Sequence, residues 1–70
     1  MTLIEFMDKV AISAVVQITP RFSDEFKTTA KRFFNEPDGG SDYAEMYVVS
    51  INAGYPGALE IKVNTEDKYW

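Results

Sequence analysis

The sequence predicts a small α+β domain in which two helices pack on a C-terminal β-hairpin, in the order ααββ. Three observations indicate this fold: two strand-like runs joined by a Gly- and Pro-containing connection, a capped helical pattern before them, and an apolar run near the start of the chain. Seventy residues leave room for one hydrophobic core. We therefore expect residues 1–70 to form a single domain.

The N-terminal run, residues 3–18, fits a helix and also fits a strand. A helix would gather most of its apolar residues in one arc, and Thr2 and Glu5 have the spacing of a capping box. A strand would explain the alternation of apolar and polar positions over residues 10–19, which are rich in β-branched side chains. The sequence leaves both interpretations open.

The strand interpretation leads to an alternative fold. It is a three-stranded antiparallel sheet, formed by residues 10–19, 44–52 and 58–65 and covered by a helix over residues 23–35. A third strand would support the hairpin, because a two-stranded ribbon is only marginally stable by itself.

The second helix is predicted over residues 23–35. Ser23 is a favourable N-cap, and the two acidic residues that follow it suit the positive end of the helix dipole. A Pro-Asp-Gly-Gly sequence ends the helix and begins a loop that we expect to be exposed and mobile. Phe22, Phe26 and Phe33 are expected to pack on the hairpin.

The hairpin is predicted over residues 46–63, with its connection at residues 53–57. Apolar and polar positions alternate on both sides of the connection, which is typical of strands with one buried face. The glycines and the proline of the connection suit a turn. The expected buried face consists of Tyr47, Val49, Ile51, Leu59, Ile61 and Val63.

The composition removes most catalytic chemistry. The chain has neither cysteine nor histidine, so thiolate nucleophiles, disulfides, ordinary zinc sites and imidazole acid–base groups are excluded. The acidic loop Asp38–Asp42 has oxygen ligands but lacks the spacing of a calcium loop, and its glycines lack the context of a dinucleotide fingerprint. We predict a protein that is not an enzyme, with no catalytic residue, cofactor, metal or small-molecule substrate.

The location predicted from the sequence is the cytoplasm. The N-terminus is interrupted by acidic residues where a signal peptide needs a basic region followed by an apolar run. The uncharged stretch Val10–Pro20 is too short to span a bilayer. We expect no contact with a membrane.

The net charge of −4 is unevenly distributed along the chain. No lysine or arginine occurs from Phe33 to Ile61, whereas five carboxylates do. Such a one-signed surface attracts an oppositely charged partner. The candidate partner-binding residues are these carboxylates, the tyrosine at the hairpin tip and the terminal tryptophan: Glu36, Asp38, Asp42, Glu45, Tyr55, Glu60 and Trp70.

These features predict a small acidic module that binds another protein with a basic surface and inhibits or modulates it. The basic surface could be one that normally binds nucleic acid, which the acidic module would mimic. Short acidic proteins of similar size and composition are common among phage-encoded inhibitors of host defence; this similarity involves no sequence motif.

Two alternatives remain. The chain could be a structural subunit of a homo-oligomer, such as a homodimer, or of a larger assembly, with Ile12, Val16 and Trp70 at the interface. It could also be a nucleic-acid accessory protein that uses Lys27, Lys31 and Arg32 of helix 23–35. Nucleic acid is the less expected partner, because the acidic half of the chain repels a polyanion.

Overall fold

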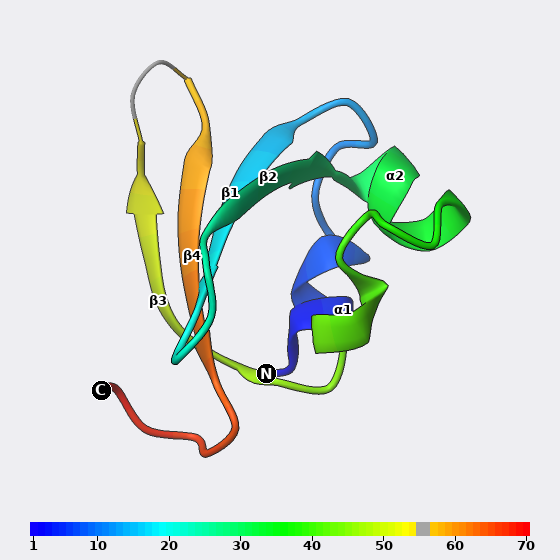
Figure 1. Ribbon diagram of the computed structural model, residues 1–70. Coiled ribbons are helices and arrows are strands. Elements are labelled where there is room, and N and C mark those ends of the chain that lie inside the picture. The colour runs from blue at the N-terminus through cyan, green and yellow to red at the C-terminus, as the bar shows by residue number, and fades with distance from the viewer. Residues whose placement is uncertain (55–56) are drawn as a thin grey trace.

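A computed structural model describes residues 1–54 and 57–70, which form a four-stranded mixed sheet with its helices on one face (Figure 1). The strand order is β2-β1-β4-β3; β1 and β4 are parallel, and the two outer pairs are antiparallel. The α+β class is confirmed, but the order ααββ is wrong, since two further strands are present. The elements are α1 (Leu3–Met7), β1 (Val15–Pro20), β2 (Phe26–Thr29), α2 (Ala30–Asn35), the 3-10 helix η1 (Ser41–Tyr43), β3 (Tyr47–Ala53) and β4 (Leu59–Asn64).

The C-terminal hairpin is confirmed. Strands β3 and β4 pair antiparallel from Tyr47 opposite Asn64 to Ala53 opposite Leu59. The register shifts between Val48 and Ser50, as at a β-bulge, and Val48 packs on the core. The bulge places Val48 and Ile51 opposite the buried Val63 and Ile61, so the expected buried face is right on β4 and only partly right on β3.

The residues of that expected face differ in how deeply they are buried, because β4 is an inner strand of the sheet and β3 is an edge strand. Ile61 and Val63 are fully buried and Leu59 packs against them, whereas Tyr47 and Ile51 are 38% and 50% exposed. Residues 55 and 56, including the predicted hairpin-tip residue Tyr55, lie outside the described residues.

The N-terminal segment combines the two interpretations of residues 3–18. Helix α1 begins as predicted, with the Thr2 N–H donating to the Glu5 carboxylate (2.8 Å), but it ends at Met7. The β-branched residues that follow form β1, which lies between β2 and β4 in the sheet. Because β1 runs parallel to β4, the all-antiparallel alternative sheet is also wrong.

The predicted helix 23–35 exists only in its second half. Phe26–Thr29 forms β2, which pairs with β1 from Phe26 opposite Ile18 to Thr29 opposite Val15. The N-cap of α2 is Thr29, whose hydroxyl accepts the Arg32 N–H (3.2 Å), and not Ser23. Phe22 lies in the β1–β2 turn with φ 70° and is 90% exposed, so it is absent from the core.

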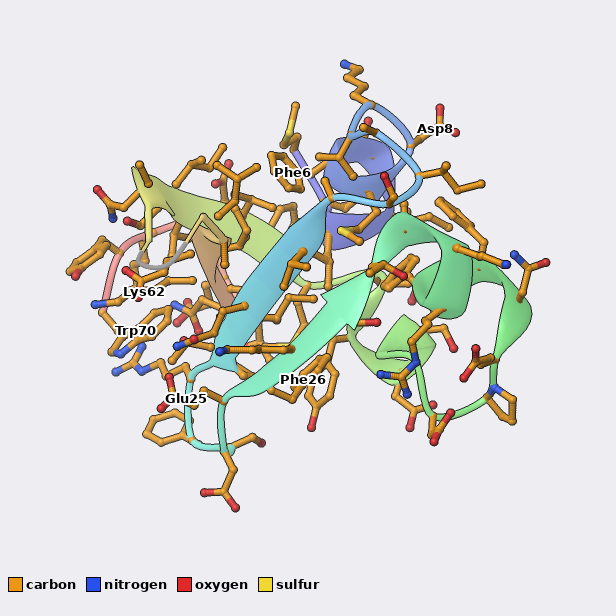
Figure 2. The ribbon with its side chains drawn as sticks, turned by 90° about the horizontal axis from the view of Figure 1, so that it is seen from above. Phe6, Asp8, Glu25, Phe26, Lys62 and Trp70 are labelled. Carbon is orange, nitrogen blue, oxygen red and sulfur yellow. The ribbon has the colours of Figure 1, made fainter. Side chains whose placement is uncertain are left out.

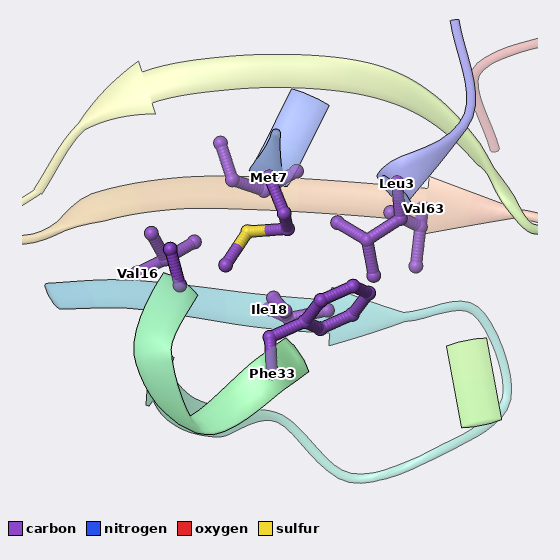
Figure 3. Close-up of a cluster of buried hydrophobic side chains, with 8 residues drawn as sticks. Leu3, Met7, Val16, Ile18, Phe33 and Val63 are labelled. Carbon is purple, nitrogen blue, oxygen red and sulfur yellow. The ribbon is translucent and has the colours of Figure 1, made fainter. Parts of the chain in front are cut away.

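The core lies between the sheet and the helices (Figure 3). Its largest side chain is Phe33 from α2, which is 2% exposed. Helix α1 is fixed above the sheet because its first N–H groups reach a distant segment: Leu3 donates to the Met46 carbonyl (2.8 Å) and Ile4 to that of Ala44 (2.9 Å). The other core side chains are Leu3, Met7, Val16, Ile18, Ala30, Ile61 and Val63.

The α-helices are short. Those in the described part of the chain have five and six residues, and none has the length and apolar character needed to cross a membrane.

Candidate protein-docking surface

A groove separates α1 from α2 on the outer side of the helical layer. It consists of two adjoining hollows of about 390 and 290 Å³ that share Ile4 and Phe34. Glu36, Pro37 and Ala44 also line the larger hollow. We call this feature the interhelical groove. Its two shared side chains are 43% and 49% exposed, so it offers an apolar surface to solvent.

The apolar floor of the groove follows from helical geometry. Consecutive residues of a helix point about 100° apart, so Phe33 enters the core while Phe34 faces outward. The two rings meet edge to face, with centroids 5.1 Å apart. In the same way Leu3 is buried and Ile4 is exposed on α1. In each helix, therefore, an apolar core residue is followed directly by an apolar residue that lines the groove.

The acidic segment after α2 is fixed to the sheet. The Thr28 hydroxyl donates to the buried Gly39 carbonyl (2.7 Å), and the Gly39 N–H donates to that of Glu36 (3.1 Å). A Cβ on Gly39 would lie 2.1 Å from the Arg32 carbonyl oxygen, so only glycine fits there. The segment is exposed, as expected, and its backbone is held to the sheet at Gly39.

Carboxylates line both hollows of the groove. Glu5 and Asp8 line the smaller hollow, and Glu36 lines the larger one. Arg32 offsets part of this charge, because it pairs with Glu36 (Nε to Oε1, 3.2 Å) and with Asp38 (Nη2 to Oδ1, 3.6 Å). Both pairs are largely exposed to solvent, which limits their strength.

The remaining carboxylates of the helical side make no ion pair within the described residues. They are Asp8, Asp42 and Glu45. Glu5 accepts the backbone N–H and the hydroxyl of Thr2, and these hydrogen bonds lower its pKa, so it is ionised at neutral pH.

The segments that surround the groove, residues 3–9 and 30–45, hold six carboxylates against three cations. They carry a net charge of −3 out of the total of −4. The surplus of acid is thus concentrated on the helical side of the molecule.

The predicted binding residues do not form one site. Glu36, Asp38, Asp42 and Glu45 belong to the fixed acidic segment. Glu60 is exposed on β4 opposite Asn52, in the alternation that places Ile61 in the core.

Trp70 contacts its own chain on the other side of the sheet. Its ring stacks on that of Tyr69 at 5.8 Å, and the Lys62 ammonium lies 5.6 Å from its centroid. Figure 2 shows Lys62 and Trp70 close together and far from Asp8.

The residues predicted for the two alternative functions, nucleic-acid binding and oligomer formation, do not form a common surface. Lys27 lies on β2 and not on a helix, and Arg32 is engaged by two carboxylates. Val16 is fully buried and unavailable for an interface, whereas Ile12 is 65% exposed.

The groove has the apolar and acidic groups needed to bind a partner's side chains. The described residues contain no group of three or more His, Cys, Asp or Glu that could hold a metal ion. Sequence reasoning missed Ile4, Glu5, Asp8 and Phe34 as surface residues of one site. The adjacent phenylalanines were the available signal, since consecutive helical residues point about 100° apart and the second ring can turn outward when the first enters the core. Comparison with protein-family models, curated proteins and solved structures finds no match for this chain.

Proposed function

We propose that this chain is a non-enzymatic protein-binding module that docks on a basic surface of a partner and thereby inhibits or modulates it. The observation that supports this proposal is the interhelical groove, in which exposed Ile4 and Phe34 are bordered by carboxylates. Contiguous exposed apolar surface with a polar rim is typical of protein interaction sites.

The two components of the groove have different roles. Desolvation of the apolar floor supplies affinity, in the way of a small interface hot spot. The one-signed charge around it accelerates encounter with a basic surface and disfavours acidic ones. A basic surface that normally binds nucleic acid would meet both conditions if it also carried apolar groups, which agrees with an anti-defence inhibitor that mimics nucleic acid.

Charge reversal tests this function. Proteins captured from a host lysate by the wild-type chain would be purified and their affinity measured against the Asp42→Lys, Glu45→Lys double variant. We expect at least about tenfold weaker binding of the partner and a strong loss of wild-type binding with added salt.

The matched control is the Glu66→Lys, Asp67→Lys double variant, which makes the same change of charge on the C-terminal tail. It should retain the partner. Equal losses in both variants would show that total charge alone matters, and unchanged binding in both would overturn the proposed function.

A further inference from the structure

We infer that the ligand of the interhelical groove is a short segment of the partner in which one large apolar side chain has lysine or arginine on both sides. This inference rests on the proposed function and specifies the chemistry of the bound segment. It follows from the placement of apolar and acidic groups along the groove.

The apolar part of the ligand is indicated by the centre of the groove. The two hollows meet at Ile4 and Phe34, so an inserted side chain would contact α1 and α2 together. Both residues are held in position, Ile4 by the hydrogen bond from its N–H to Ala44 and Phe34 by its contact with the buried Phe33 ring. Each hollow is small and open to solvent, which suits a side chain better than an enclosed substrate.

The cations of the ligand are indicated by the ends of the groove. Glu5 and Asp8 line one hollow, and Glu36 lines the other, so carboxylates stand on both sides of the apolar centre. The ion pair with Arg32 involves the Oε1 atom of Glu36. The other oxygen of Glu36 has no ion pair within the described residues and can receive a cation from the partner.

A second copy of this chain is a poor occupant. Among the residues that the structure describes, no exposed large apolar residue has a lysine or arginine close by on both sides. Phe22, for example, follows Arg21 but precedes a serine and two acidic residues. The charge pattern of the groove therefore favours a different protein.

The test uses three synthetic peptides: one with a central leucine between two pairs of arginines, one with serine in place of the leucine, and one with glutamates in place of the arginines. Each is titrated into isotope-labelled protein while the NMR signals of the Ile4 methyl groups and the Phe34 ring are followed. We expect the leucine–arginine peptide to shift these signals and to bind at least about tenfold more tightly than either of the others.

Matched variants separate the groove from the rest of the surface. Phe34→Ala should weaken the leucine–arginine peptide about fivefold or more, whereas Phe22→Ala, at a 90% exposed aromatic outside the groove, should leave it unchanged. Asp8→Asn should weaken it, and Asp67→Asn should not. Urea unfolding of each variant shows whether the fold is retained.

Equal binding of the leucine and serine peptides would overturn the inference, because the protein would then recognise only the positive charge of the peptide. The proposed function would remain intact. Shifts confined to the open face of the sheet would also overturn it. So would self-association of the free chain that Phe34→Ala abolishes, because a second copy would then occupy the groove. Failure of the proposed function is detected by a different experiment, the partner capture with the Asp42→Lys, Glu45→Lys variant.

Discussion

The two faces of the sheet differ in what covers them (Figure 1). The face under α1 and α2 is apolar and inaccessible; Val16, Ile18, Ile61 and Val63 have no exposed surface. The other face has no helix over it among the described residues. Polar residues that alternate with the buried ones point to this face: Gln17, Thr19, Glu60 and Lys62.

The open face satisfies many of its polar groups internally. The Gln17 amide donates to the Glu25 carboxylate, and the Asn64 amide donates to the Lys68 carbonyl (2.8 Å). Lys62 donates to the Tyr69 hydroxyl (3.0 Å), so the C-terminal tail is fixed against the sheet.

The helical side, by contrast, leaves Asp8, Asp42 and Glu45 without ion pairs in the described residues and exposes Ile4 and Phe34. The stabilising core and the candidate docking surface therefore both involve the helical layer. One side of each helix holds the fold together, and the other side is available to a partner.

The largest expected effect separates those two sides within α2. Phe33→Ala should lower the free energy of unfolding by about 3–5 kcal/mol, because it removes a buried ring and leaves a cavity. Phe34→Ala should cost about 1 kcal/mol, mainly the edge-to-face contact with Phe33. Urea unfolding followed by far-UV circular dichroism measures both. Similar costs for the two variants would show that α2 does not divide its core and docking roles in this way.

Local patterns in the sequence predicted the fold where local interactions decide it. The C-terminal hairpin and the Thr2–Glu5 capping pair are of this kind, and both are found in the structure. Residues 26–29 are different: they pair with β1, which ends at Pro20 and so lies outside the predicted helix, and no pattern inside that helix reports this partner. Strand pairing overrode helix propensity there.

The sequence predicts the negative charge of the candidate site but not the arrangement of its residues in space. The carboxylates of residues 36–45 are visible in the sequence. Their proximity to Glu5 and Asp8 depends on α1 docking against Ala44 and Met46 through backbone hydrogen bonds. Backbone groups are the same in every residue, so side-chain patterns do not encode this contact.

A smaller effect is expected on the open face. Lys62→Met should cost about 0.5–1 kcal/mol, because it removes the cation from the Tyr69 and Trp70 rings. Trp70 is the single tryptophan, so its fluorescence reports the tail directly and should shift to longer wavelength as the ring becomes more exposed. Lys68→Met, which breaks only an exposed ion pair with Glu66 (3.8 Å), is the control and should change neither quantity appreciably. An unchanged spectrum in Lys62→Met would mean that the tail is fixed by other contacts.

The smallest effect concerns the pH dependence of α1. The backbone N–H of Thr2, and then its hydroxyl, lower the pKa of Glu5 from its ordinary value of 4.5. A carboxylate whose pKa is lower in the folded state stabilises that state fully above its unfolded pKa and loses the contribution as the pH falls through the folded value. Glu5→Gln should therefore lower the urea midpoint at about pH 7 and lower it by less at about pH 2.5, where a larger share of the wild-type Glu5 is protonated.

The control for Glu5 is Asp67→Asn, which removes one negative charge from the tail without touching α1 and should not reproduce this pH-dependent difference. An equal loss in Glu5→Gln at both pH values would assign the role of Glu5 to packing instead of charge. Because the same carboxylate lines the groove, a confirmed difference has a second consequence. Acid would loosen α1 and neutralise one end of the docking surface together, so that stability and binding of a cationic segment should decline over the same pH range.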